Sequence, residues 1–250
     1  MNDNRLAEHW AGWELEMIAK KWVVWLAFMT SAGWMPAAIA QPVADTGEWF
    51  AIFAQGDLER VRESSPNLKW WFDGHLRFLD DAGGYNQSIV RPGVGVKLTE
   101  HAVAWVGYAW VHTDPVAGLE FDEHRIWQQV TWSNTYGQWT FAARSRLEQR
   151  FVETGDDLGW RFRQLVRAQR PFDLFPRLSF VLWDEAFFHL NDTDWGARTG
   201  FDQNRAFGGL GFKRTPEAKG RVEFGYLNDT LDIPSGNDRT HHLLSVNFYY

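Results

Sequence analysis

Hydrophobic and polar side chains alternate along most of the chain beyond residue 40. Between Leu68 and Phe78, Leu, Trp and Phe occupy one face of an extended chain, while Lys, Asp, His and Arg occupy much of the other. A period of two is typical of a β-strand with one apolar and one polar face. The alternation predicts one weak strand followed by ten clear ones: 48–55 (weak), 68–78, 88–98, 102–112, 123–132, 139–150, 159–169, 177–188, 203–212, 220–228 and 241–250.

The lengths of these segments favour a membrane barrel. They run to about ten residues or more, which exceeds the usual five or six of soluble sheets and matches a tilted membrane crossing. Short connections alternate with longer acidic ones, as in outer-membrane barrels with short periplasmic turns and long external loops. The short ones are 99–101, 134–137, 171–176 and 214–219, and the long ones are 113–122, 153–158, 191–202 and 229–240.

The predicted fold is therefore all-β: an antiparallel transmembrane β-barrel of 10 to 12 strands. Eleven segments conflict with the even strand number normal for single-chain bacterial barrels. We therefore expect either that one segment is wrongly predicted or that the weak segment 48–55 lies outside the barrel wall. A soluble β-sandwich is the alternative fold, in which the apolar faces would pack against a second sheet.

The first 40 residues differ from the rest. Two lysines precede an apolar stretch at 22–33, a breaker follows at Pro36, and small residues lead to Ala40. This order predicts a cleavable signal peptide over 1–40, leaving 41–250 as the barrel domain. Acidic residues before Met17 suit a signal peptide poorly, so translation starting at Met17 is an open alternative, as is a single membrane anchor at 22–40.

The chain ends on an alternating strand. It resembles the C-terminal targeting strand that the insertion machinery of outer-membrane barrels reads. Together with the signal peptide, it predicts the outer membrane of a Gram-negative bacterium, with outer-membrane lipids and the barrel-insertion machinery as partners. Its alternating apolar or aromatic residues are Leu244, Val246, Phe248 and Tyr250.

Composition narrows the function classes. The 250 residues include no cysteine, which excludes disulfides, zinc clusters of cysteine and thiol nucleophiles. Asp and Glu outnumber Lys and Arg by 32 to 25, and this net charge of -7 argues against nucleic-acid binding. No histidine pair at metal-ligand spacing and no twelve-residue calcium loop occur, so we expect neither metal nor cofactor.

Sixteen tryptophans are the most unusual feature of the composition. Some fall near predicted strand ends, where amphipathic rings form the interfacial girdles of membrane barrels. Others share the polar face of their strands, where they can stack on guanidinium groups. The girdle set is Trp49, Trp132, Trp139 and Trp160, and the inward set is Trp71, Trp127 and Trp183.

The polar face of the strands carries more basic than acidic residues, although the chain as a whole is acidic. Two interpretations remain open: a hydrogen-bonded network that fills the interior, or a narrow channel with a basic lumen for a small anionic solute. The predicted lumen charge network is Asp73, His75, Arg77, Arg91, Glu123, Arg125, Arg144, Arg146, Glu148, Arg150, Arg161, Arg163, Glu185 and Arg205.

A lipid-modifying enzyme of the acyl hydrolase type is the alternative function. If Trp132 faces Trp139 across the turn, His124 and Ser145 become diagonal neighbours on the lipid side. A hydroxyl next to an imidazole is the minimum for nucleophilic catalysis, but no third group to orient the imidazole is evident. We therefore expect a non-enzymatic barrel, with His124 and Ser145 as weak catalytic candidates.

Several short sequence segments resemble those of a known family. They are "WWFDGHLRFLDDAGGYNQSIVRPG" from Trp70, "DEHRIWQQ" from Asp122, "RSRLEQRF" from Arg144, "LNDTDWG" from Leu190 and "FDQNR" from Phe201. They are similar to the uncharacterised family called domain of unknown function 2490, over about residues 49–250. The resemblance implies a bacterial outer-membrane β-barrel of unassigned activity. It brings no catalytic residues.

Overall fold

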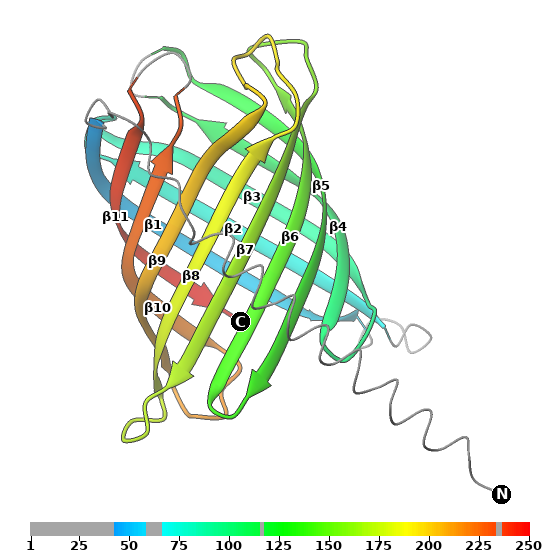
Figure 1. The fold of residues 1–250 in the computed structure, drawn as a ribbon, viewed down its shortest axis with the longest axis vertical. Helices are drawn as coiled ribbons and strands as arrows, with labels where there is room; N and C mark the ends of the chain where they lie inside the picture. The colour runs from blue at the N-terminus through cyan, green and yellow to red at the C-terminus, as the bar shows by residue number, and fades with distance from the viewer. Residues whose placement is uncertain (1–42, 59–66, 116–117, 234–236) are drawn as a thin grey trace, which may run out of the picture. The chain divides into compact units, whose positions relative to one another are not determined.

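A computed structural model describes residues 43–58, 67–115, 118–233 and 237–250 (Figure 1). The predicted signal peptide lies outside these residues. The described chain forms a closed all-β barrel of eleven strands, one for each predicted segment. The strands are β1 Val43–Asp57, β2 Leu68–Leu79, β3 Gly84–Lys97, β4 Ala102–Thr113, β5 Phe121–Tyr136, β6 Trp139–Val152, β7 Gly159–Pro171, β8 Leu178–His189, β9 Gly200–Lys213, β10 Arg221–Leu231 and β11 Arg239–Tyr249.

The barrel closes by pairing its first and last strands in parallel. Each strand pairs antiparallel with its sequence neighbours, whereas β1 and β11 run in the same direction, from Val43 opposite Arg239 to Phe53 opposite Tyr249. Strands that alternate up and down leave the first and the eleventh pointing the same way, so an odd number requires a parallel seam. The expectation that one segment was wrong or lay outside the wall is therefore wrong, and antiparallel pairing fails at this seam alone.

The two ends of the barrel differ. We call them the long-loop end, uppermost in Figure 1, and the short-turn end, where the chain terminates. Between Tyr136 and Trp139 the chain turns in two residues, and Gly137 has a φ of 61°, which favours glycine. Among the connections that join β3 to β11, the long-loop end carries 114–120, 153–158, 190–199 and 232–238, and the short-turn end carries 98–101, 137–138, 172–177 and 214–220.

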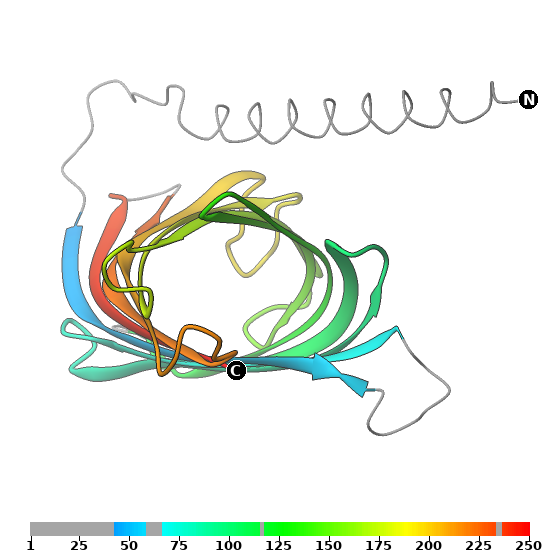
Figure 2. The same ribbon diagram turned by 90° about the horizontal axis from the view of Figure 1, so that it is seen from below.

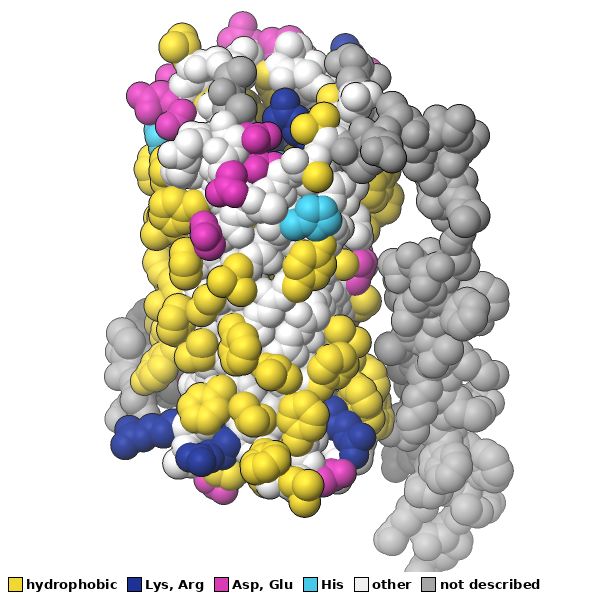
Figure 3. All heavy atoms as spheres, turned by 90° about the vertical axis from the view of Figure 1, so that its left-hand side faces the viewer, with side chains coloured by type: hydrophobic (Ala, Val, Ile, Leu, Met, Phe, Trp, Pro, Cys, Tyr) yellow, Lys and Arg dark blue, Asp and Glu magenta, His cyan; other side chains and the backbone are white. Residues whose placement is uncertain are grey.

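Apolar side chains cover the outer wall. Figure 3 shows hydrophobic residues over the middle of one face, with Asp and Glu gathered towards the long-loop end and Lys and Arg towards the short-turn end. Along β11, Leu244 and Phe248 are 57% and 46% exposed, whereas the intervening Ser245 and Asn247 are buried. The alternation predicted for the last strand is thus present, and its role in targeting stays a prediction.

Glycines in the strands make room for large inward side chains. A Cβ on Gly107 would lie 2.3 Å from the Trp127 ring and 2.3 Å from the carbonyl oxygen of Pro92, and one on Gly93 would lie 2.5 Å from the same ring. Trp127 is fully buried inside the barrel. Glycine at these two positions therefore lets the indole lie flat against the wall.

The prediction that Trp49 belongs to the interfacial girdle is wrong. Trp49 points into the barrel, is 5% exposed, and lies beneath the guanidinium groups of Arg77 and Arg205, at 4.1 and 4.5 Å from the ring centroid. The weak alternation of the first segment hid which residues face inward. Trp160, by contrast, is 37% exposed on the outer wall, in agreement with its predicted side.

Because β11 lies between β10 and the seam with β1, a proline in it removes a ladder hydrogen bond where no edge strand can absorb the loss. We expect Val246→Pro to prevent formation of the closed barrel. The measurement is the heat-modifiable mobility of the folded protein in detergent. Val246→Ala should keep the folded band, and a folded Val246→Pro protein would contradict the parallel seam.

Candidate functional site in the barrel interior

A network of arginines and buried carboxylates fills the upper part of the interior. Glu148 is fully buried and accepts hydrogen bonds from Arg161 Nη2 and Arg163 Nη1, both at 2.8 Å. Arg163 in turn donates to Glu185 through Nε and Nη2, each at 3.0 Å. The chain of charged partners then continues to Arg144, whose Nη2 lies 2.8 Å from Glu185 Oε1. Charge-assisted pairs of this kind hold desolvated ions in place.

Glu123 is a second centre of the same network. Arg125 donates to it through Nε at 2.7 Å and Nη2 at 2.6 Å, and Arg150 donates through Nε at 2.5 Å. Arg125 and Arg150 face each other across β5 and β6. A carboxylate between two arginines neutralises only one of them, so these clusters keep an excess of positive charge.

Two further buried carboxylates, Asp73 and Asp229, lie on β2 and β10. Asp73 Oδ1 is 2.7 Å from Arg91 Nη1 and 2.8 Å from His75 Nε2. Asp229 lies 3.2 Å from Arg77 and 3.3 Å from Arg205. The sequence placed Asp229 in a loop, but β10 continues to Leu231. Its inward position was detectable from the alternation of Leu227, Asp229 and Leu231.

A cavity of about 940 Å³ runs between these side chains. Its lining residues include Thr113 and Leu231 near the long-loop end and Lys97 and Lys219 near the short-turn end, so it extends along the barrel. Figure 2 shows how the strands encircle the interior. Basic residues dominate its surface, thirteen against five acidic ones. The basic ones are Lys69, Arg77, Arg91, Lys97, Arg125, Arg144, Arg150, Arg161, Arg163, Arg167, Arg205, Lys219 and Arg221, and the acidic ones are Asp57, Glu100, Glu123, Glu185 and Asp202.

The imbalance arises because several carboxylates lie behind the arginines. Asp73, Glu148, Glu223 and Asp229 are fully buried and do not line the cavity, whereas arginines that pair with them do. Five buried guanidinium nitrogens, on Arg77, Arg91, Arg144 and Arg146, have no hydrogen-bond acceptor among the described residues. The lining of the cavity is therefore cationic because the carboxylates that neutralise its arginines lie behind them.

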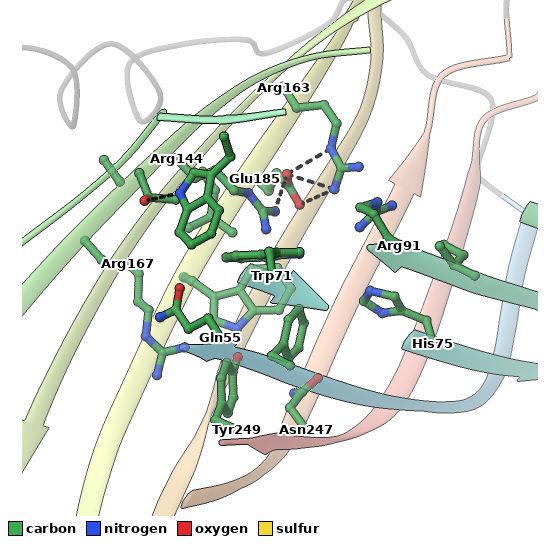
Figure 4. A pocket seen from close by; sticks show the side chains of 18 of the residues that line it. Gln55, Trp71, His75, Arg91, Arg144, Arg163, Arg167, Glu185, Asn247 and Tyr249 are labelled. Carbon is green, nitrogen blue, oxygen red and sulfur yellow. Dashed lines mark hydrogen bonds and ion pairs between the residues drawn. The ribbon is translucent and has the colours of Figure 1, made fainter. Parts of the chain in front are cut away.

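Aromatic side chains form the other part of the cavity wall. Figure 4 shows Trp71 between Arg144 and the side chains of Gln55 and Tyr249, with Arg167 alongside. Trp71 packs edge-on against Trp105, with 5.3 Å between ring centroids. Flat apolar surfaces next to guanidinium groups suit an anion with an organic body as well as an inorganic one.

The connection 190–199 folds over the long-loop end. The Trp195 ring lies 4.9 Å from the Arg150 guanidinium, and its Nε1 donates to the carbonyl oxygen of Asp157 at 2.8 Å. The backbone amides of Asp156 and Asp157 donate to the Asp194 carboxylate at 2.9 and 3.2 Å. Hydrogen bonds from these amides, the one from Asp156 foremost, hold the pKa of Asp194 below its usual range.

The predicted lumen residues all lie on inward-facing positions of their strands. Some of the strongest partners were missed: Asp229, Asp202 in β9, and Tyr249 at the chain end. Asp202 lies 3.3 Å from Arg161 and 3.2 Å from His189. The prediction placed Asp202 in a long loop, so its pairing with the wall was not visible in the sequence.

The predicted pairing of His124 with Ser145 is wrong. Trp132 faces Ala143 rather than Trp139, which shifts Ser145 to a position opposite Val130. Six residues then separate it from His124 along the strand, or about 20 Å. Ser145 instead donates to Gln164 at 2.6 Å, and His124 Nδ1 lies 2.5 Å from the Tyr108 hydroxyl. The error arises from the turn between β5 and β6, which spans residues 137–138, whereas the predicted connection was 134–137.

Comparison with known proteins agrees with the resemblance seen in the sequence. The family model described as "Protein of unknown function (DUF2490)" matches residues 46–240. The chain belongs to this family. An uncharacterized protein of Methylorubrum extorquens is 34% identical over 217 residues, covering 85% of this chain and 90% of the relative. No solved structure matches.

In the described ranges, no group of three or more His, Asp or Glu is arranged to hold a metal ion. No helix in the same ranges is long and apolar enough to cross a membrane. This member of the DUF2490 family is a barrel with a charged interior, and the family description assigns it no activity.

Removing one buried carboxylate tests the network. We expect Glu148→Gln to destabilise the barrel by about 3–5 kcal/mol, because Arg161 and Arg163 would lose their shared counter-charge inside the barrel. The free energy of unfolding in urea measures the effect. Glu48→Gln, on the exposed outer face, should change it by less than about 0.5 kcal/mol. Equal effects would contradict a network that stabilises the barrel.

The Asp194 carboxylate should anchor the connection 190–199 at neutral pH. Its folded pKa is lowered, so the stabilisation is present above the ordinary aspartate pKa and lost as pH falls through the folded value. We expect Asp194→Asn to speed tryptic cleavage at Arg198 at pH 7. Asp156→Asn is the control, because Asp156 contributes its backbone amide. Unchanged cleavage in Asp194→Asn would refute the anchor.

Proposed function

We propose that this protein is an outer-membrane barrel whose basic lumen passes or holds small anionic solutes. One observation carries the proposal: thirteen basic and five acidic residues line a cavity that extends from the long-loop end to the short-turn end. Rings of arginine and lysine favour anions in pores. The net charge of the whole chain is negative, so the positive lumen is a local feature and not a consequence of composition.

The outer wall supports a membrane location. Most of the outward-facing residues of the strands are apolar, and large ones such as Val94, Val106 and Phe224 are about half exposed, at 52%, 48% and 46%. A soluble barrel would leave this surface in water, whereas lipid covers it without cost. Recovery of the protein in the outer-membrane fraction after cell lysis is the expected result.

A purely structural barrel is the competing function. Its support is the same charge network, which fills much of the upper interior and would narrow any path. The two functions differ in one measurable property. A channel conducts ions with a preference for anions, whereas a closed structural barrel does not conduct at any voltage and excludes neutral and anionic solutes equally.

Ion selectivity in planar bilayers tests the channel. We expect a reversal potential that favours chloride over potassium, and we expect Arg144→Gln to lower that preference roughly fivefold, since one exposed charge at close range is worth about 1 kcal/mol through water. Arg144 suits the test because Glu185 keeps Arg163 as its partner when Arg144 is replaced.

The matched control is Arg198→Gln, an exposed arginine outside the cavity lining that pairs with Asp192. It should leave selectivity unchanged. Absence of conductance from folded protein, or equal permeability to anions and cations, would favour the structural barrel instead.

A further inference from the structure

Three side chains with complementary chemistry meet on the outer wall near the long-loop end. Ser88 in β3 is the direct cross-strand partner of His112 in β4, which is in turn the direct partner of Asp122 in β5. All three face outward, since the residues next to them, such as Gln87 and Thr113, line the inner cavity. Directly opposed residues on one sheet face hold their Cβ atoms about 4.5–5.5 Å apart.

The imidazole of His112 is held by Asp122. His112 Nδ1 lies 2.7 Å from Asp122 Oδ1, and because an ionised carboxylate only accepts hydrogen bonds, Nδ1 carries the proton. Trp110 Nε1 donates to the second oxygen, Oδ2, at 3.0 Å. This arrangement leaves Nε2 as the basic nitrogen, as an orienting carboxylate does in serine hydrolases. The nearest carboxylate to Nε2 is Glu120 of the exposed loop, at 3.6 Å.

The serine has its own partner. The Tyr85 hydroxyl donates a hydrogen bond to Ser88 Oγ at 2.9 Å, so Oγ can still donate its own proton to another acceptor. Tyr85 also stacks on the His112 ring, with 6.1 Å between centroids and 20° between planes. Attack by Ser88 requires a rotation about χ1 that turns Oγ from Tyr85 towards the imidazole of its cross-strand partner His112, and contacts between nucleophile and base are commonly loose before substrate binds.

A β-bulge brings Tyr85 to this face. Tyr85 lies three positions before Ser88, so strict alternation would place the two side chains on opposite sides of the sheet. The pairing of β2 with β3 shifts register at this point: Arg77 faces Gln87 and Phe78 faces Tyr85, leaving Asn86 as the extra residue. Bulges that redirect a side chain are over-represented beside active sites.

The position of these residues on the wall indicates the substrate. Towards the short-turn end, the same strands expose Val90, Val94 and Val106. Towards the long-loop end lie the exposed carboxylates of Asp114 and Glu120. If the wall lies in a membrane, as proposed above, the three residues stand at the boundary of acyl chains and headgroups, where the ester bonds of lipids lie.

We propose that Ser88, His112 and Asp122 form a hydrolase site for acyl esters of membrane lipids. Ser88 Oγ attacks the ester carbonyl carbon while its proton passes to His112 Nε2. The bond from the acyl carbon to the alcohol oxygen breaks, and His112 returns the proton to the alcohol. Water, deprotonated by His112, then attacks the acyl-serine, releases the fatty acid and restores Ser88. Once Ser88 Oγ has turned away from it, the Tyr85 hydroxyl donates its proton to the carbonyl oxygen as that oxygen becomes negative.

Asp122 acts through His112 and is a positioning residue, whereas Ser88 and His112 are catalytic residues. The activity goes beyond solute passage, because it uses the outer wall and none of the residues that line the cavity. It also replaces the pair of His124 and Ser145, which the strand register keeps apart.

The test uses the folded barrel in detergent micelles and in vesicles. An alkyl fluorophosphonate should label the protein, and a short-chain ester in micelles should be hydrolysed. Ser88→Ala should abolish labelling and lower hydrolysis by at least about 100-fold. Ser145→Ala is the matched control, because Ser145 is another outward-facing serine of the wall and bonds to Gln164. It should behave as the unaltered protein.

Two further readouts separate catalysis from structure. Asp122→Asn should slow hydrolysis and move the acidic limb of the rate profile to lower pH, since the protonated imidazole loses its anionic partner. Heat-modifiable mobility verifies that each variant is folded. If folded protein is neither labelled nor active, or if Ser88→Ala retains both properties, the proposal is overturned.

Two experiments with lipid vesicles identify the lipid that carries the ester. Vesicles of phospholipid and vesicles containing lipid A are incubated separately, and released fatty acid is measured. Release from either supports the proposal and names the source of the ester. Hydrolysis of the short-chain ester without release from either lipid would overturn the assignment to membrane lipids. Failure of ion conductance leaves these readouts unaffected, because they do not depend on the lumen.

Discussion

The parallel pairing of β1 with β11 is the constraint on which the rest of the molecule depends. Eleven alternating strands can close only if the first and last run in the same direction, and closure removes every sheet edge in the described barrel. It also fixes which residues of β1 face inward. Trp49 thereby comes to lie beneath Arg77 and Arg205, and Phe53 stacks on Tyr249 across the seam.

Closure creates an interior that side chains must fill, and here the filling is ionic. Charges removed from water require partners, which explains why fully buried Glu148 and Glu223 each contact more than one arginine. Carboxylates placed nearer the wall and arginines placed nearer the axis give a stable network with a basic surface. Structural support and the proposed attraction of anions would thus come from one arrangement, and a measurement of conductance distinguishes the two functions.

The outer wall carries chemistry of a different kind. Its apolar residues suit lipid, but Ser88, His112 and Asp122 interrupt them near the long-loop end. Their grouping depends on three adjacent strands in one register and on a bulge that turns Tyr85 outward. The interior and this outer group share no residues, so a barrel of this size has room for two independent activities.

The alternation along the chain predicts the strands and, outside β1 and the strand ends at Asp202 and Asp229, the inward position of the charged residues, because a period of two is a local property that each segment carries. It did not determine register. Trp132 was expected opposite Trp139 and lies opposite Ala143, a shift of four residues that leaves every face unchanged and so is invisible to the pattern. The parallel seam and the pairing of Asp229 with Arg77 join segments far apart in the chain, and closure of the barrel brings them together. The meeting of Ser88 with His112 depends instead on the register between the neighbouring strands β3 and β4.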